Sequence, residues 1–128
     1  MMTAGALKSG MQEFCGTEKY YFHPLNRKVN YTDGFKWFLQ SAECYWLLDI
    51  LITEFYGVAS EWTAKEGDEF FAITVESKDS KATIKAKSYN YEGQEVDMFK
   101  KNIDFTDLPE GEWKFYYSYG VILLPSEY

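Results

Sequence analysis

The spacing of apolar residues divides the chain into a helical first half and an alternating second half. A first helix is predicted over residues 4–14, ending near Gly16, because apolar side chains recur at helical spacing at Leu7, Met11 and Phe14. A wider apolar arc predicts the main helix over residues 42–56, with Gly57 placed for a left-handed end. Such a wide arc is typical of a helix that is covered on more than one side.

Between these two helices the pattern changes to a short hairpin and a capping sequence. Aromatic and β-branched runs within residues 19–31 flank residues 26–27, which are predicted to form the hairpin turn. Pro24 cannot donate to a ladder, so its stretch is expected at an edge or a bulge. The sequence Thr32-Asp33-Gly34 offers side-chain oxygens that cap a helical turn, and Ser41 is expected to cap the start of the main helix.

The second half alternates apolar and polar residues in short runs between turns. The runs predict five strands, with a bulge expected near residues 100–101, and they cover residues 71–75, 82–86, 96–105, 113–118 and 121–124. Short connections favour antiparallel neighbours. The predicted fold is therefore α+β. An N-terminal helix, a short hairpin and one main helix pack on an antiparallel meander sheet of five or more strands, in a single domain over residues 1–128.

Composition narrows the classes of function. The chain has 128 residues and a formal net charge of -7, which argues against direct binding to nucleic acid. One His and two Cys are too few for a zinc site built from these residues alone, and no metal or cofactor is expected. No secretory signal or membrane span is seen, so we expect a cytoplasmic protein in which Cys15 and Cys44 stay reduced.

The candidate catalytic residues are one histidine and a few carboxylates that would orient it. His23 is the only side chain whose ordinary pKa suits proton transfer near neutral pH. Asp33, Asp49 and Glu18 are candidate orienting carboxylates, and a small enzyme that uses His23 with Asp33 or Asp49 is one hypothesis. No motif places these residues together, so a structural histidine is the preferred interpretation.

Aromatic residues make up 20% of the chain, which is more than a small core needs. Tyrosine is enriched at protein interfaces because it joins a large apolar body to a polar tip. We therefore favour a non-enzymatic interaction module that binds a protein partner or self-associates, a homodimer included. The candidate interaction residues are Tyr89, Tyr91, Tyr116 and Tyr119. An acidic inhibitor of a nucleic-acid-binding protein is the alternative.

Four motifs, in order along nearly the whole chain, carry a resemblance to a known family. They are T-E-x-Y-x-x-H at residues 17–23, Y-T-D-G at 31–34, Y-W-L-L-D at 45–49 and L-L-P-S-E-Y at 123–128. The chain resembles a family of small bacterial and phage proteins catalogued only as a domain of unknown function. The resemblance implies a soluble cytoplasmic protein and supplies no activity. Pro24 and Tyr119 depart from the family pattern, which leaves the hairpin geometry open.

Overall fold

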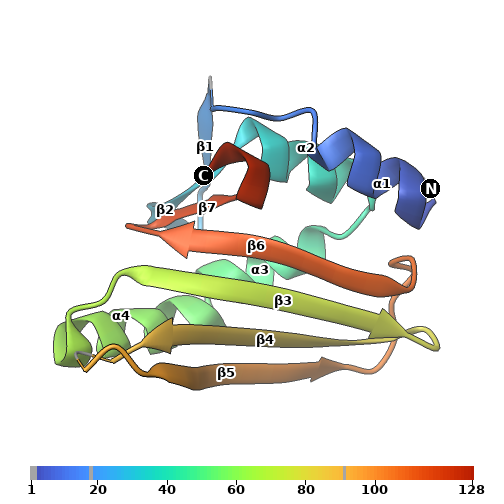
Figure 1. Cartoon of the computed structure of the whole chain (residues 1–128). Coiled ribbons are helices and arrows are strands. Elements are labelled where there is room, and N and C mark those ends of the chain that lie inside the picture. The colour runs from blue at the N-terminus through green and yellow to red at the C-terminus, as the bar shows by residue number, and fades with distance from the viewer. Residues whose placement is uncertain (1–2, 18, 91) are drawn as a thin grey trace.

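The protein has an α+β fold, as the sequence predicts. The computed structural model describes residues 3–17, 19–90 and 92–128 (Figure 1). The helices are α1 (Ala4–Met11), α2 (Asp33–Ser41), α3 (Tyr45–Ile52), α4 (Glu54–Glu66) and the 3-10 helix η1 (Pro125–Glu127). The strands are β1 (Tyr20–His23), β2 (Asn26–Thr32), β3 (Phe70–Lys78), β4 (Lys81–Tyr89), β5 (Glu95–Ile103), β6 (Gly111–Ser118) and β7 (Val121–Leu123).

The strands form one seven-stranded sheet in the order β1-β2-β7-β6-β3-β4-β5. Strands β3, β4 and β5 follow one another as a meander, and β6 then returns to pair with the opposite edge of β3. The β1–β2 hairpin joins the same sheet, because β2 pairs in parallel with β7. Local strand patterns do not encode these two long-range pairings, so the predicted sequential order holds only within β3–β5 and β6–β7.

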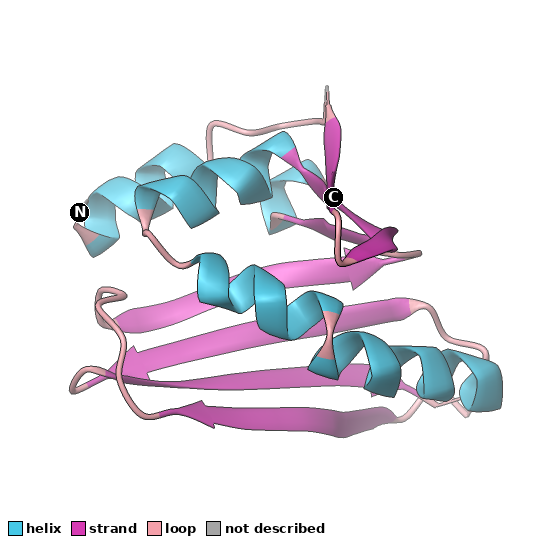
Figure 2. Ribbon diagram, turned by 180° about the vertical axis from the view of Figure 1, so that it is seen from behind, coloured by secondary structure: helices cyan, strands magenta, loops and turns pink. Residues whose placement is uncertain are grey.

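The helices cover one face of the β3–β6 part of the sheet (Figure 2). Alternate residues of β3, β4 and β6 point to this side and are buried there. Their core partners on the helices are large apolar side chains, among them Phe35, Phe38, Leu47, Leu51 and Phe55. In the described part of the chain, no helix covers the opposite face, which lies toward the viewer in Figure 1. We call it the open face.

The predicted main helix is two helices. Thr53 leaves helical geometry with φ -112° and ψ -84°, and its hydroxyl donates to the Asp49 carbonyl over 2.6 Å. Helix α4 then continues through Gly57, so the prediction that Gly57 ends the helix was wrong. The left-handed end is Gly67, with φ 80°, because buried Phe55 and Ala59 keep the helical pattern running. Ser41 closes α2 instead of starting the next helix.

Two smaller boundaries also differ from the sequence prediction. The hairpin turn lies at residues 24–25 instead of 26–27, because Pro24 lacks the N–H that a ladder position needs. The bulge in β5 lies at Met98, between the pairs Ala86↔Phe99 and Lys87↔Asp97, and not near residues 100–101. The bulge allows both Met98 and Phe99 to pack against the core.

The carboxylate of Glu127 joins segments that are far apart in the sequence. It accepts hydrogen bonds from the Thr32 hydroxyl (2.7 Å), the Leu124 N–H (3.0 Å), the Thr17 hydroxyl (3.3 Å) and the Gly34 N–H (3.3 Å). Thr32 also caps α2, because its oxygen accepts from the Phe35 N–H over 3.1 Å. A carboxylate at the start of a helix is further stabilised by the helix dipole. Three of the four resemblance motifs therefore meet at one side chain.

Glycine at position 34 is required by this arrangement. A Cβ atom built on Gly34 would lie 2.5 Å from Glu127 Oε1, well inside van der Waals contact. Gly57 is the contrasting case, because a Cβ there would meet nothing within 4 Å and the backbone is helical.

We expect Gly34→Ala to lower the free energy of unfolding by about 2–4 kcal/mol, since it displaces the half-buried Glu127 carboxylate at the centre of a charge-assisted network. The matched control Gly57→Ala should raise it by about 0.5–1 kcal/mol, because alanine is the better helix former. Urea denaturation of both variants checks the pair. Equal effects of the two substitutions would contradict the role given to Glu127.

Candidate functional site

The three candidate catalytic residues do not form a common site. His23 lies half-buried at the turn end of the hairpin, where its Nδ1 accepts from the Leu25 N–H over 3.1 Å. Asp33 begins α2, and its Oδ1 accepts from the Gly34 N–H over 3.2 Å. Asp49 is exposed on α3. Among the described residues, no hydrogen bond or ion pair joins His23 to either carboxylate; Glu18 lies outside them.

The hairpin itself keeps His23 and Asp33 apart. His23 pairs with Asn26 at one end of β2, and Asp33 follows Thr32 at the other end. Six residues of strand span about 20 Å, which is too far for a shared proton. Asn26 ties the turn to the end of α3 through its Nδ2, which donates to the Ile52 carbonyl over 2.9 Å. The geometry therefore assigns His23 a contact within the turn.

The candidate interaction tyrosines occupy different parts of the surface. Tyr116 and Tyr89 point to the open face, from β6 and from the end of β4, and Tyr89 is 43% exposed. Tyr119 lies in the β6–β7 turn on the helix side and is 77% exposed. Tyr91 lies outside the described residues. The three described tyrosines therefore do not define one continuous surface.

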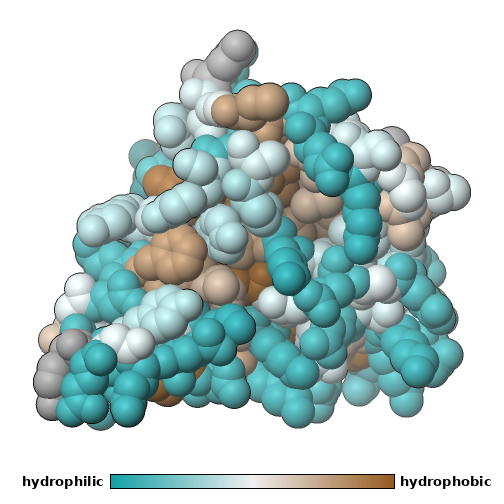
Figure 3. Space-filling model, in the orientation of Figure 1, coloured by the Kyte–Doolittle hydropathy of each residue, from teal (hydrophilic) through white to brown (hydrophobic). Residues whose placement is uncertain are grey.

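Tyr116 belongs to an aromatic cluster on the open face, which sequence reasoning located only in part. Its ring lies 5.1 Å from the ring of Phe70 and 5.3 Å from that of Tyr128, and Phe70 and Tyr128 are also 5.3 Å apart. Phe70 belongs to the outward register of β3, and η1 brings Tyr128 back to this point. The space-filling view shows apolar surface interrupting the polar surface on this side of the molecule (Figure 3).

Beside the aromatic cluster, strand register sets like charges next to each other. The lysine row crosses four strands in the order Lys114, Thr74, Lys85 and Lys100. The glutamate row crosses the same strands, two residues further along, in the order Glu112, Glu76, Thr83 and Asn102. Neither row is visible in the sequence, because it depends on which strands pair and in which register.

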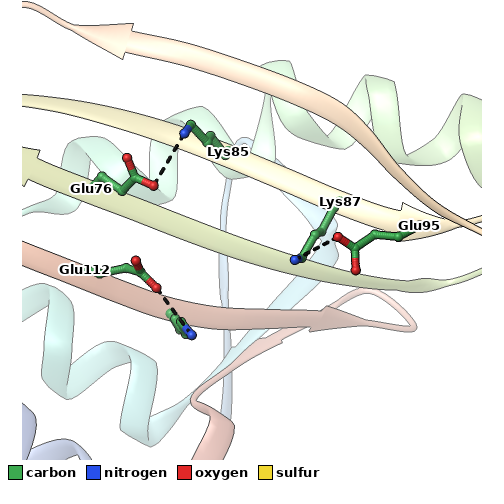
Figure 4. A network of polar contacts seen from close by, with 6 residues as sticks. Glu76, Lys85, Lys87, Glu95 and Glu112 are labelled. Atoms are coloured by element: carbon green, nitrogen blue, oxygen red, sulfur yellow. Dashed lines mark hydrogen bonds and ion pairs between the residues drawn. The ribbon is translucent and has the colours of Figure 1, made fainter.

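Ion pairs connect some of these groups within the open face (Figure 4). Lys85 contacts Glu76 over 3.4 Å, Lys114 contacts Glu112 over 3.3 Å, and Lys87 contacts Glu95 over 3.0 Å. The bond to Glu95 raises the pKa of Lys87. A shallow groove of about 410 Å³ runs between these side chains, over the small residues Ala72 and Thr74.

A second cavity lies on the helix side of the sheet. We call it the α4 pocket; its volume is about 400 Å³, and it lies between α4 and the ends of β3 and β6. The exposed turn residue Tyr119 stands at its rim, and Tyr117, only 5% exposed, forms part of its floor. Burial, reinforced by the nearby Tyr56 and Glu69, raises the pKa of Tyr117 from 10.0 to about 12. Its hydroxyl therefore stays protonated at neutral pH.

Asp68 anchors the sheet next to this pocket. Its carboxylate accepts from the Ser88 hydroxyl over 2.7 Å, from the Tyr89 N–H over 3.0 Å and from the Phe70 N–H over 3.2 Å. Desolvation alone would raise the pKa of Asp68, but these hydrogen bonds outweigh it and lower the pKa. Asp68 thereby holds β3 and β4 together where the aromatic cluster begins.

Two kinds of arrangement are absent from the part of the chain that the structure describes. No group of three or more His, Cys, Asp or Glu side chains is placed to hold a metal ion there. None of the helices in that part is long and apolar enough to cross a membrane.

Comparison with known proteins yields one match. The sequence model of a family described as "Family of unknown function (DUF6876)" matches residues 5–128. No curated protein and no solved structure matches the chain.

The raised pKa of Tyr117 predicts a loss of stability at alkaline pH. The folded state holds the phenolic proton more tightly than the unfolded state does. This contribution is therefore fully present below pH 10 and is lost as the pH rises from 10.0 toward about 12. Urea denaturation between pH 8 and pH 11 should show a smaller decline for Tyr117→Phe than for the parent chain. The free energy of unfolding of Tyr119→Phe, at an exposed position, should fall with pH as that of the parent chain does. The same pH dependence in all three proteins would contradict the raised pKa of Tyr117.

Proposed function

The chain belongs to the family of unknown function DUF6876, and from its own surface we propose that it is a protein-interaction module that self-associates through the open face of β3–β6. The observation that carries the proposal is the pair of like-charged rows on this face. A second copy can lay its oppositely charged row over each of them.

Each row carries a cost in a single copy of the protein. Glu76 lies directly across from Glu112, and Lys85 lies directly across from Lys100. Like charges in directly opposed positions destabilise a sheet. Intramolecular ion pairs offset part of this cost, but Lys100 forms none with the described residues. A surface that keeps such rows gains from a partner of complementary charge.

The two rows make the open face complementary to itself. They run side by side across the same four strands, about 7 Å apart. A two-fold axis that lies in the interface, between and parallel to the rows, turns the lysine row of one copy onto the glutamate row of the other. Each strand then lies over its own counterpart, so Lys114 meets Glu112 directly, Lys85 faces Thr83 next to Glu76, and Lys100 faces Asn102. The contact is then isologous, as in most homodimers.

The size of the face sets the strength that we expect. Four strands of about eight residues cover roughly 20 Å by 26 Å, which corresponds to the small end of stable interfaces. The aromatic cluster of Phe70, Tyr116 and Tyr128 adds apolar area beside the charged rows. We expect a dimer with a Kd of about 1–100 µM that weakens as salt is added, because exposed charges are screened.

A cytoplasmic location goes with this proposal. Cys15 and Cys44 are both free thiols, the first exposed and the second buried. Burial raises the pKa of Cys44 to about 12, so it remains an unreactive core residue.

Charge reversal tests the proposal directly. Lys85→Glu with Lys114→Glu makes an acidic open face, and Glu76→Lys with Glu112→Lys makes a basic one. Each double variant should be monomeric, with a Kd at least about 100-fold weaker than the parent, because like rows then meet like rows. An equimolar mixture of the two should form a heterodimer, which sedimentation velocity at low salt will resolve.

The control is Glu61→Lys, on the exposed side of α4, which changes the net charge and leaves the open face intact. It should dimerise like the parent, and circular dichroism should show that all variants are folded. The proposal fails if the parent is monomeric at about 500 µM and low salt, or if the acidic and basic variants do not associate with each other.

A further inference from the structure

The α4 pocket contains polar groups that no neighbour satisfies. Tyr117 is 5% exposed and lines the pocket, and its hydroxyl forms no hydrogen bond with the described residues. A hydroxyl that opens into a cavity can donate to, or accept from, a molecule that enters it. At neutral pH the protonated Tyr117 hydroxyl is available as a donor.

The walls of the pocket explain why it is hollow. Helix α4 turns one stripe toward the end of the sheet, and three of its members are small: Ala59, Ser60 and Ala64. Opposite them lie Phe71 and Tyr117, whose rings pack against Phe55 at 5.6 Å and 5.3 Å. The large side chains are therefore fixed on one side of the pocket and do not fill the space left on the other.

Two opposite charges face this space without neutralising each other. Lys28 comes from β2 and Glu69 from the residue before β3, and both line the pocket. Among the described residues, neither takes part in an ion pair. A ligand that carries both an anionic and a cationic group would satisfy them together.

The rim carries a strained aromatic residue. Tyr119 has a left-handed backbone with φ 51°. This conformation is unfavourable for a residue with a bulky side chain, and asparagine or glycine adopts it more readily. Its N–H donates to the Glu69 carbonyl over 3.1 Å, which fixes the turn beside the pocket. The chain thus holds an exposed aromatic ring at the mouth of a polar cavity.

We propose that the α4 pocket binds a small zwitterion with a flat apolar body, of the aromatic α-amino acid class. The ligand carboxylate meets Lys28 and accepts from Tyr117, and its ammonium meets Glu69. The ring lies over Ala64, with Tyr119 at the edge. A volume of about 400 Å³ lies within the range for small-molecule sites. The pocket is on the opposite side of the sheet from the charged rows, so this inference does not rest on self-association.

The test is an NMR titration of the full chain with three probes. L-tryptophan carries both charges, tryptamine lacks the carboxylate, and indole-3-propionate lacks the ammonium. Tryptophan should bind saturably with a Kd of about 1 mM or tighter, shifting the amide signals of residues that line the pocket. Each of the other two probes should bind at least about tenfold more weakly, because either Lys28 or Glu69 then has no partner on the ligand.

Matched variants assign each contact. Lys28→Gln should weaken tryptophan at least about tenfold and leave tryptamine unchanged; Glu69→Gln should weaken tryptophan and leave indole-3-propionate unchanged. Lys78→Gln, at the far end of β3, is the control and should change neither. Ala64→Phe should block the pocket. Tyr119→Asn should raise the stability, because asparagine tolerates the left-handed backbone, and should weaken binding.

Each outcome of the titration tests a different part of the proposal. Absence of saturable shifts up to about 20 mM tryptophan overturns the site. Equal affinity for the three probes overturns the zwitterion assignment. So does tryptophan binding that is unchanged by Lys28→Gln and by Glu69→Gln. The double variant Lys85→Glu with Lys114→Glu, which should be monomeric, should bind tryptophan like the parent. Tryptophan binding is therefore tested independently of dimerisation.

Discussion

The carboxylate of Glu127 is the contact on which the arrangement of the N-terminal third depends. It accepts from the Gly34 N–H in the first turn of α2, from the Thr32 hydroxyl that caps this helix, and from the Thr17 hydroxyl in the segment before β1. Because Glu127 follows β7 by only a few residues, the same contact keeps β7 beside β2. The hairpin, the first helices and the C-terminal segment therefore form one unit around a single charge at a helix N-terminus.

This unit and the helices leave the sheet with two different sides. On one side, α3 and α4 cover the sheet, and the small residues of α4 leave a polar pocket at its end. On the other side, the aromatic cluster and the two charged rows face solvent. The two proposed activities use opposite sides, so a partner on the open face does not close the pocket. The sheet between them connects the two sites through Ala72, Phe71 and their neighbours along β3.

Local features could be predicted from the sequence, and long-range features could not. A helix cap was predicted at Thr32 or Asp33 because capping needs only the next three residues, and Thr32 is the residue that caps α2. The stretch around Pro24 was expected at an edge or a bulge because proline lacks the N–H, and β1 is an edge strand with a bulge at this end. Gly57 was misassigned as a helix end because its place in α4 depends on buried neighbours such as Phe55 and Ala59. The lysine and glutamate rows depend on the return of β6 to β3, and the partners of Glu127 lie about a hundred positions away. No local pattern contains that information.

The parallel pairing of β2 with β7 has a consequence for biosynthesis. Residues 30–31 meet residues 121–122, so this pair closes the longest loop in the sheet. As the polypeptide leaves the ribosome, the β1–β2 hairpin has no neighbour to complete its ladder until β7 has been made. The β3–β5 meander can assemble meanwhile, since its pairings are local. For most of translation the edge of β2 that pairs with β7 is consequently left open, and this interval is when the nascent chain is most in need of a chaperone.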